Sequence, residues 1–578
     1  MGFRLHAASL PHPAPARRRH GAGPPHCRGG STTNRLGRVT DAPTSPPTTE
    51  TGATPPTAEP TERRFRLPDP TGPAPRPWTR TDTWTFLGIG ILALLTRFFR
   101  LSFATGNGTP VFDEKHYVPQ AWDMVRSAGN PVTGGIESNP GFGLVVHPPL
   151  AKQLLAYGEM IFGYTPLGWR LSTALFGVAT VLTVMALTRR LTGSPVATAA
   201  AGVLALVEGV LLVSSRFGML DIFQAFFVTA AAYCLARDFD EVWRRYHRAW
   251  ADGTLREVSR GIGPRVGFRW WRFGCGILLG LTLSVKWSGL YYMAFFGVLT
   301  VCLDIWLRHH YRIARPFSGM LLRDAFPAFA SIVIVPVLVY AWSWRAWFAS
   351  ETGVYRHSAV NGDIAPDSPL SALPDALAGW VYYHQRVLTF HASLTSSGGH
   401  SHPWDSKPWS WLAATRPILY FSETGLECGD DTCRRMIMLF GNPAVWWLTV
   451  PVVLWGIWCL VIRRDLRFAV PVTGFTAGWL PWLIAYDRQM YFFYATAMVP
   501  FTVVLLAITL AQIARTGGPA RIRFPRVPFP RKLTTGGLGV ICYLALTVTL
   551  FCYFLPIFYG FRITDDHFNS LMWLRSWK

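Results

Sequence analysis

The sequence predicts an all-α membrane protein that crosses the bilayer many times. Half of its 578 residues are hydrophobic, and only 15% are charged. The hydrophobic residues come in blocks of about 17–22, the length that an α-helix needs to cross the hydrocarbon core of a bilayer. Soluble chains carry more charge than this, so the composition excludes a soluble protein.

Eleven of these blocks are expected to be membrane spans. They follow residues 1–80, which are rich in Pro, Thr, Ala and Arg, show no hydrophobic periodicity and are expected to form a disordered cytoplasmic tail. The expected spans lie near residues 84–102, 167–187, 196–213, 219–236, 273–288, 290–307, 325–347, 444–462, 467–485, 491–512 and 535–558.

Arginine decides the orientation of these spans. The chain has a net charge of +22, and its arginines gather in the connections near residues 237–272, 308–315, 463–464 and 515–532. With a cytoplasmic N-terminus, all four connections lie on the cytoplasmic side, as the positive-inside rule requires. Basic loops there contact the headgroups of membrane lipids, so the charge does not indicate a nucleic acid as partner. Two long loops, residues 103–166 and 348–443, then lie outside with the C-terminus.

The first outer loop carries two adjacent acids, Asp113 and Glu114. They stand between apolar Phe112 and aromatic Tyr117, which favours a position at the membrane interface. A carboxyl group near apolar surface has a raised pKa and can accept a proton from a hydroxyl group. Two neighbouring acids in extended backbone cannot aim at one point, so one would act as a base while the other binds substrate, a cation or an arginine. A solvated pair without a chemical role is the alternative.

Other ionisable residues are candidates for the same face. Arg97, at the end of the first span, is expected to reach back to the acids, and His147 begins a rigid His-Pro-Pro turn. Arg216 and Asp221 lie at the outer end of a span, where charge indicates a functional site by default; an ion pair between them that closes the hairpin is the alternative. Lys286 either binds a lipid phosphate or extends to the headgroups.

The second outer loop combines cations and histidine with several tryptophans. His402, Lys407 and Arg416 in this setting suit a sugar and a phosphate group, although tryptophan also anchors loops at the membrane interface. The histidine spacing matches no usual set of metal ligands, so no metal site is expected. Cys428 and Cys433 are too few for a structural zinc site and are expected to form a local disulfide on the oxidising side of the membrane.

Six motifs, in one order, resemble a known family. They lie over roughly residues 97–447 and read VFDEKHY, VHPPLAKQLL, RFGMLD, VKWSGLY, PWSWLAATRPILYF and GNPAVWW. This series resembles the protein O-mannosyltransferase family. No β-rich insertion separates the motifs, which is similar to the bacterial form of these enzymes. The late segment near residues 486–501 departs from the family pattern, with Phe493-Tyr494 in place of His-Tyr.

The resemblance implies a GT-C glycosyltransferase with about 11 transmembrane helices and two large outer-face loops. The donor would be polyprenyl-phosphate-mannose, and the acceptor a Ser or Thr hydroxyl of a secreted or translocating protein at the outer face of the cell membrane, with the secretion translocon as a candidate partner. Residues 81–515 would then form the catalytic domain, and residues 516–578 a cytoplasmic basic loop with the last span.

The resemblance also implies roles for single residues. Asp113 and Glu114 match the required acid pair of the family, and we expect Asp113 to be the general base and Glu114 to bind the acceptor or the sugar. The cations expected to neutralise the phosphate leaving group are Arg97, Arg170, Arg216 and Lys286. These cations make a metal-free mechanism sufficient, and whether a divalent cation assists is left open.

Two other functions compete with this one. A transferase of the same architecture that acts on a lipid or a polysaccharide would differ mainly in the ordered motifs. A secondary transporter would show broken helices at mid-membrane and paired halves, whereas this chain has no long internal repeat and carries its charges at the outer ends of spans.

Overall fold

The computed structural model describes residues 69–128, 146–520 and 533–578. Most of the expected tail, residues 1–80, therefore lies outside the described residues. Its last part does not look like a free tail: residues 69–79 run extended along the helices, where Arg76 forms an ion pair of 2.9 Å with Asp240. The carbonyl of Thr71 also accepts a hydrogen bond of 2.9 Å from the indole of Trp243.

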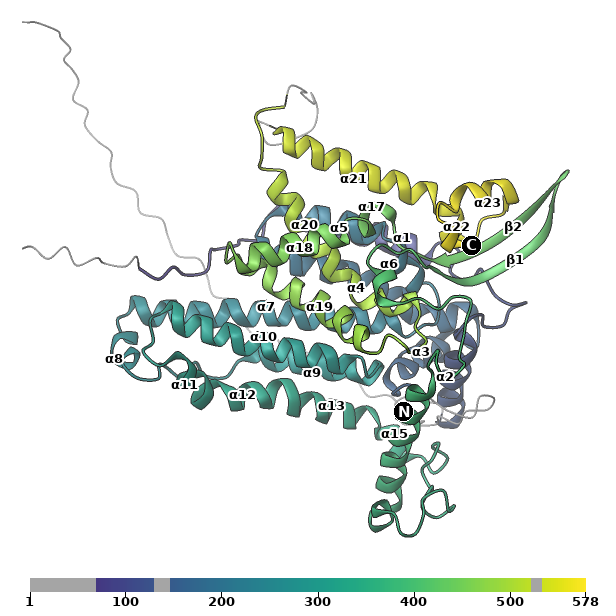
Figure 1. The fold of residues 1–578 in the computed structure, drawn as a ribbon, viewed down its shortest axis with the longest axis horizontal. Coiled ribbons are helices and arrows are strands. Elements are labelled where there is room, and N and C mark those ends of the chain that lie inside the picture. The colour runs from purple at the N-terminus through teal and green to yellow at the C-terminus, as the bar shows by residue number, and fades with distance from the viewer. Residues whose placement is uncertain (1–68, 129–145, 521–532) are drawn as a thin grey trace, which may run out of the picture. The chain divides into compact units, whose positions relative to one another are not determined.

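Each of the eleven expected spans coincides with helix (Figure 1). The helices in the first half of the chain are α1 (Arg80–Phe98), α2 (Glu114–Ala128), α3 (Leu150–Phe162), α4 (Pro166–Thr192), α5 (Pro195–Leu206), α6 (Gly209–Ser214), α7 (Asp221–Ala251), α8 (Leu255–Ser259), α9 (Trp270–Val285) and α10 (Gly289–His310).

The later helices include short ones in the outer loops. They are α11 (Pro316–Met320), α12 (Phe326–Phe329), α13 (Val335–Ser343), α14 (Arg345–Ala349), α15 (Asp375–Ser393), α16 (Pro408–Trp411), α17 (Pro443–Trp446), α18 (Thr449–Val461), α19 (Ala469–Ile484), α20 (Val499–Ile513), α21 (Thr535–Tyr553), α22 (Leu555–Tyr559) and α23 (Asp565–Leu571). Wider π-helical turns join α11, α12 and α13 into one rod, and short 3₁₀ segments cover residues 369–372, 466–468, 492–497 and 575–577.

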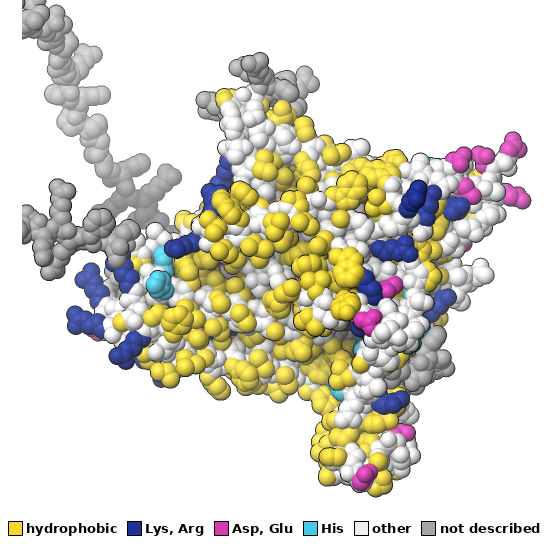
Figure 2. All heavy atoms as spheres, viewed as in Figure 1, with side chains coloured by type: hydrophobic (Ala, Val, Ile, Leu, Met, Phe, Trp, Pro, Cys, Tyr) yellow, Lys and Arg dark blue, Asp and Glu magenta, His cyan; other side chains and the backbone are white. Residues whose placement is uncertain are grey.

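Six stretches of helix among the described residues are long and apolar enough to cross a membrane. They are α4, α7, α10, the rod of residues 316–343, the α17–α18 segment of residues 443–461, and α21. The shorter apolar helices α5, α9 and α20 lie between them in the sequence. Hydrophobic side chains form a broad surface over the middle of the bundle in Figure 2, as lipid contact requires.

Local sequence signals explain where the main helices begin. Thr79 caps α1 in a capping box with Asp82, and Thr165 and Ser194 cap α4 and α5 just before a proline at the first helical position. Gly193 ends α4 with φ of 65°, the left-handed conformation that glycine adopts without strain. These caps place the short turn between α4 and α5.

Two of the expected spans have different limits in the structure. The span near 196–213 is two helices, because Glu208 breaks the run and caps α6 through a 2.8 Å hydrogen bond from the Leu211 N–H. The span near 325–347 begins at Pro316, since Arg308 of α10 pairs with Asp324 at 2.7 Å and buries an acid that interrupts the hydrophobic pattern.

An antiparallel sheet departs from the all-helical expectation. Strands β1 (Ile418–Cys428) and β2 (Asp431–Leu439) form a hairpin, and β3 (Ile563–Thr564) extends it in the order β1-β2-β3. Cys428 and Cys433 are joined by a disulfide next to the turn, as expected. The start of β1 is buried and its outer half is largely exposed, so the hairpin reaches from the bundle outwards (Figure 1).

The bundle has two chemically different ends. We call the end with the loops after α7 and α10 and before α19 the basic end, and the end with the sheet, α2, α3 and α15 the site end. Figure 2 shows arginine and lysine gathered at the basic end and acids at the tip of the hairpin. At the basic end, Arg269 lies between Asp238 and Asp304, with Nε–Oδ1 of 3.0 Å to Asp238 and Nη1–Oδ1 of 2.6 Å to Asp304.

Candidate functional site

Four hydrogen-bond donors surround the carboxylate of Glu114. Its carboxylate is fully buried at the start of α2. Arg170 of α4 donates two hydrogen bonds of 2.7 Å, from Nε to Oε1 and from Nη2 to Oε2. The backbone N–H groups of Gly218 and Val111 donate at 2.7 and 3.3 Å. All four hydrogen bonds hold this carboxylate inside the protein. The expected contact of Glu114 with the acceptor or the sugar would require some of these hydrogen bonds to break.

Arg170 also hydrogen-bonds the backbone that follows α1. Its remaining N–H groups donate to the carbonyls of Leu101 at 3.0 Å, Ala104 at 2.9 Å and Phe103. The guanidinium is buried, and it carries no free donor toward a cavity. Arg170 therefore fixes the loop that leads to the acid pair, and binding of phosphate by Arg170 stays a prediction that this geometry does not favour.

Asp113, the neighbouring acid, has the opposite surroundings. Its side chain is half-buried, and no hydrogen bond or ion pair holds its carboxylate among the described residues. Burial raises the pKa of Asp113 to about 6; the positive charge of Lys286 lowers this pKa and the negative charge of Asp221 raises it. An unpaired carboxylate with such a pKa can accept a proton near neutral pH.

The backbone just before Asp113 is strained. Phe112 has φ of +54°, which is unfavourable for a bulky residue. Its ring stacks on Tyr420 of β1, with 4.3 Å between the ring centroids, and also meets Phe493 at 6.1 Å. Strain of this kind persists only where the surroundings enforce it, as at functional sites, and here the aromatic contacts of Phe112 enforce it directly before Asp113.

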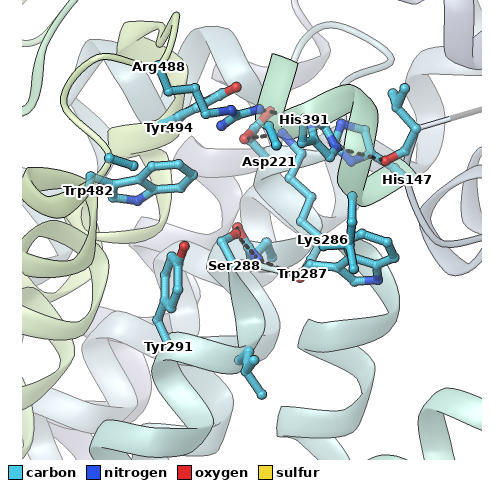
Figure 3. Close-up of a pocket in the computed structure, with 16 residues that line it drawn as sticks. His147, Asp221, Lys286, Trp287, Ser288, Tyr291, His391, Trp482, Arg488 and Tyr494 are labelled. Carbon is cyan, nitrogen blue, oxygen red and sulfur yellow. Dashed lines mark hydrogen bonds and ion pairs between the residues drawn. The ribbon is translucent and has the colours of Figure 1, made fainter. Parts of the chain in front are cut away.

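A cavity of about 400 Å³ lies at the site end (Figure 3). Asp113 is not among its lining residues, but Phe112 contacts Phe493, and the ammonium of the lining residue Lys286 lies 5.2 Å from the Phe493 ring centroid. Residues far apart in the sequence line it, from the loop before α3, the start of α7, the α9–α10 turn, α15, the end of α19 and the segment that follows. The lining residues are Val146, His147, Asp221, Gln224, Lys286, Trp287, Ser288, Leu290, Tyr291, Leu388, His391, Ala392, Trp482, Ala485, Arg488 and Tyr494.

Lys286 and Asp221 form an ion pair on the wall of the cavity. The distance from Lys286 Nζ to Asp221 Oδ1 is 2.7 Å, while Asp221 Oδ2 is buried and has no hydrogen-bond partner among the described residues. The ammonium of Lys286 also lies 5.2 Å from the ring centroid of Phe493, at cation–π distance. The alternative pairing of Asp221 with Arg216 is wrong, because Asp221 binds Lys286.

Arg488 and His391 supply a second cationic group. Arg488 Nη2 donates to His391 Nδ1 at 2.9 Å, and His391 Nε2 donates to the Val146 carbonyl at 3.3 Å (Figure 3). Burial lowers the pKa of His391 to about 4, and the charge of Arg488 adds to this effect. His391 is therefore neutral and orients the guanidinium of Arg488, which keeps its positive charge at the cavity.

The remaining wall of the cavity is aromatic and aliphatic. Trp482 and Tyr291 lie along one side (Figure 3). Trp287 stacks on His384 with 5.5 Å between centroids. Leu290 is 55% exposed and Leu388 is 58% exposed, so the cavity has an apolar border on the outside of the bundle. A ligand that joins an anionic head to a hydrophobic chain fits this combination.

Two of the predicted phosphate-binding cations, Arg97 and Arg216, bind backbone carbonyls instead. Arg97 is fully buried and donates to the carbonyls of Leu206 and Ala205 at 3.1 and 3.2 Å, so the expected contact with the acid pair is wrong. Arg216 donates to carbonyls at the end of α1, 3.1 Å to Arg97 and 2.6 Å to Phe99. Both guanidinium groups brace α1, and their roles as substrate binders remain predictions that these contacts do not support.

Residues of the second outer loop lie beside the cavity wall. Lys407 Nζ donates to the carbonyl of Arg488 at 2.9 Å and thereby holds the segment that carries Arg488. Arg416 Nη1 donates to the Ser576 carbonyl at 2.8 Å, and the exposed ring of His402 meets Tyr491 at 5.2 Å. None of the three belongs to the described lining of the cavity.

His147 does line the cavity, as its place in the rigid turn suggested. Its ring lies 5.9 Å from the ring centroids of both Tyr117 and His391. Burial lowers the pKa of His147 well below its usual range, and the charge of Lys286 adds to this shift. A neutral imidazole at this position can give or accept a hydrogen bond. Among the described residues, no group of three or more His, Cys, Asp or Glu side chains is placed to hold a metal ion.

The sequence analysis did not single out Arg488 or Gln224 as site residues. Arg488 is a lone arginine at the outer end of a span, the same signal that marked Arg216. Its pairing with His391, 97 positions away, depends on the backbone contacts between residues 394–396 and 487–489. Gln224 lies one helical turn after Asp221 and donates to Ser288 Oγ at 2.9 Å, a contact that a single sequence does not indicate.

Two family profiles match the chain. The profile described as dolichyl-phosphate-mannose-protein mannosyltransferase matches residues 166–349, and the profile of the C-terminal four TMM region of protein-O-mannosyltransferase matches residues 376–577. The first contains Asp221 and Lys286, and the second contains His391 and Arg488. The cavity is thus built from both matched regions.

Curated relatives cover almost the whole chain. A Corynebacterium glutamicum protein named polyprenol-phosphate-mannose–protein mannosyltransferase is 58% identical over 88% of this chain and 96% of its own length. A Mycobacterium tuberculosis protein of the same name is 43% identical over 87% of this chain and 93% of its own length.

The fold is similar to that of a solved protein. A chain of the Saccharomyces cerevisiae protein O-mannosyltransferase Pmt1–Pmt2 complex bound to the sugar donor matches with a TM-score of 0.64 at 15% identity, over 87% of this chain and 93% of that chain. The likeness confirms the expected GT-C architecture.

Proposed function

The chain belongs to the protein O-mannosyltransferase family, and we propose that it transfers one mannose from polyprenyl-phosphate-mannose to a Ser or Thr hydroxyl group of an acceptor protein. It is a membrane glycosyltransferase, and the names of its relatives support this donor and this acceptor class. The observation that carries the proposal is the unpaired carboxylate of Asp113 beside a cavity that combines two cations with an apolar border.

The cavity suits the donor. Lys286 and Arg488 can neutralise the phosphate that joins the lipid to the sugar, and this charge has to be stabilised because the lipid phosphate is the leaving group. The isoprenoid chain can leave the cavity over Leu290 and Leu388, which are both exposed on the outside of the bundle. His147 and Gln224 also line the cavity and can hydrogen-bond the head of the donor.

Asp113 acts as the general base in this proposal. A Ser or Thr oxygen forms a bond to the anomeric carbon of mannose, while the bond from that carbon to the phosphate oxygen breaks and the lipid phosphate leaves. The hydroxyl proton moves to Asp113, so the nucleophile attacks without a positive charge on its oxygen. Glu114 is a positioning residue here, because Arg170 holds it away from the reacting atoms.

The outer face of the cell membrane is the proposed place of this reaction. Placing the basic end in the cytoplasm obeys the positive-inside rule and sets the cavity at the opposite face (Figure 2). The N-terminus is then proposed to be cytoplasmic, since α1 begins at the basic end, where Asp82 pairs with Arg189. Acceptors would then be proteins that emerge from the membrane, and delivery by the secretion translocon is part of this proposal. The alternatives of transfer to lipid or polysaccharide, and of a secondary transporter, find no support in the names of the relatives.

The test is turnover of a Thr-containing peptide by the purified full-length protein with synthetic polyprenyl-phosphate-mannose. Asp113→Asn keeps size and polarity but removes the base, and we expect turnover to fall roughly 10²–10⁴-fold with little change in donor affinity. Asp367→Asn, on an exposed loop, is the matched control and should leave turnover unchanged. A near-normal rate for Asp113→Asn would remove Asp113 from the chemistry.

A further inference from the structure

Tyr420 is held rigidly beside the acid pair. It lies in the buried first half of β1 and is 3% exposed. Phe112 stacks on one side of its ring at 4.3 Å, and Phe217 meets the ring edge-on at 5.1 Å. The ring therefore has a fixed position, and Phe112, its stacking partner, directly precedes Asp113 in the chain.

The hydroxyl group of Tyr420 has no hydrogen-bond partner among the described residues. Buried tyrosine hydroxyls normally find one, and two other tyrosines of this chain do. Tyr543 donates to the Ala444 carbonyl at 2.7 Å, and Tyr559 donates to the Thr96 carbonyl at 2.8 Å. An unpaired hydroxyl in a rigid, buried position costs stability. Such a hydroxyl is expected where a ligand supplies the missing partner.

A second buried polar atom without a partner belongs to the surroundings of this hydroxyl. Asp221 Oδ2 is unpaired, while Oδ1 of the same carboxylate binds Lys286 at 2.7 Å. Printed contacts connect the two groups: Phe112, which stacks on Tyr420, also meets Phe493 at 6.1 Å. The ammonium of Lys286, which binds Asp221, lies 5.2 Å from the ring centroid of Phe493. One donor and one acceptor are thus left open in the same region, next to the proposed base.

We propose that Tyr420 Oη and Asp221 Oδ2 form a subsite for one hydroxyl group of the mannosyl residue. This inference rests on the proposed function and names a part of the site that recognises the sugar. A sugar hydroxyl accepts one hydrogen bond and donates another, so it accepts from Tyr420 and donates to the carboxylate of Asp221. Both partners are already ordered, by aromatic stacking and by Lys286, so binding requires little reorganisation.

The chemistry of the pair favours a sugar hydroxyl over the other polar groups of the substrates. The phosphate group of the donor is a diester with no proton to donate to Asp221 Oδ2, and it finds its counter-charges at Lys286 and Arg488. The acceptor hydroxyl has to reach Asp113 and loses its proton there. A hydroxyl of the mannosyl ring remains, and its contact with Tyr420 would fix the ring relative to Asp113.

The experiment combines one substitution with donors that each lack one hydroxyl group of the mannosyl residue. Tyr420→Phe keeps the ring, its stacking and its burial and removes only the hydroxyl. Tyr292→Phe is the matched control, because Tyr292 is also buried with an unpaired hydroxyl among the described residues but packs against Phe296 and Phe501. Each purified enzyme is assayed with polyprenyl-phosphate-mannose and with its 2-, 3-, 4- and 6-deoxy analogues.

We expect Tyr420→Phe to lower kcat/KM for the full donor about tenfold, the value of roughly one hydrogen bond, while KM for the peptide stays unchanged. One deoxy donor should lower kcat/KM of the unaltered enzyme by a similar factor, and Tyr420→Phe should add no further loss with that donor. Tyr292→Phe should behave like the unaltered enzyme with every donor.

Equal losses from Tyr420→Phe with all five donors would show that Tyr420 acts on the acid loop and not on a sugar hydroxyl, and would overturn the subsite. Unchanged kcat/KM in Tyr420→Phe would overturn it as well, because the hydroxyl would then contribute nothing to the binding or turnover of the donor. Both results differ from a failure of the proposed function. In that case the unaltered enzyme would transfer no mannose from any of the donors.

Discussion

The two ends of the helix bundle treat buried charge in opposite ways. At the basic end, each buried aspartate has an arginine: Asp82 pairs with Arg189 at 2.7 Å, and Asp304 with Arg269 at 2.6 Å. At the site end, Asp113 has no partner among the described residues, and Asp221 uses only one of its two oxygens. Paired charges stabilise the bundle, whereas the open ones are available to a substrate.

The contrast also runs through a single pair of neighbours. Glu114 resembles the basic end, with four donors around its carboxylate, and Asp113 belongs to the open group. The strained backbone at Phe112 separates the two environments within one residue step. Adjacent acids thus divide the work: one anchors the loop and the other stays reactive.

The basic end offers the largest expected effect. Arg269→Ala would leave Asp238 and Asp304 buried with only Arg272 nearby, and breaking a buried ion pair costs about 3–5 kcal/mol. We expect a strongly lowered melting temperature in detergent, measured by intrinsic fluorescence, with turnover per folded molecule unchanged. An exposed arginine from the same end, Arg463→Ala, serves as the control for melting. A stable but inactive Arg269→Ala would contradict the division between the two ends.

The second prediction concerns Arg488, one of the two cations that line the cavity. Arg488→Gln should raise the KM for polyprenyl-phosphate-mannose by about 10–100-fold, since a charge-assisted contact contributes about 1.5–3 kcal/mol. Its melting temperature should change little, because its partner His391 is neutral and keeps its hydrogen bond to Val146. Arg386→Gln, on the same outer side and without a resolved contact to the cavity, is the control. Unchanged donor KM would remove Arg488 from the phosphate site.

The disulfide of the hairpin lies at the site end but away from the open charges. The double variant Cys428→Ser, Cys433→Ser should cost at most about 2 kcal/mol, because the closed loop is short. Turnover should stay within about twofold, since the buried start of β1 is held by its packing against Phe112 and Phe103. Mass spectrometry without reductant checks the bond itself. Two free thiols in the unaltered protein would contradict it.

The sequence predicts the parts of this protein that depend on composition and local order. Hydrophobic blocks locate the spans because the bilayer sets their length. The hairpin was not predicted, because the outer half of β1, residues 422–428, is largely exposed and shows no regular alternation of hydrophobic and polar residues. The break at Glu208 was missed because its partner Trp446 comes from 238 positions away.

The site itself was predicted in outline. Asp221 and Lys286 were named from their places at the ends of spans and His147 from its rigid turn, and all three line the cavity. Asp113 was named from the acid pair and follows Phe112, which contacts Phe493 near Lys286. The arginines were harder to assign, because charge at the end of a span is the same signal whether the guanidinium faces a cavity or carbonyls. Arg216 binds the end of α1 and Arg488 faces the cavity, and only the folded chain separates them.

The dependence of kcat/KM on pH tests the central claim, that Asp113 is an open base tuned by its neighbours. The rate should rise with pH through about 6, the pKa to which burial raises Asp113. Lys286→Gln removes a charge that lowers this pKa, so the rise should move to higher pH. Asp221→Asn removes a charge that raises it, so the rise should move to lower pH. A profile that is flat between pH 5 and 8, or shifts of the same sign in both variants, would contradict the account.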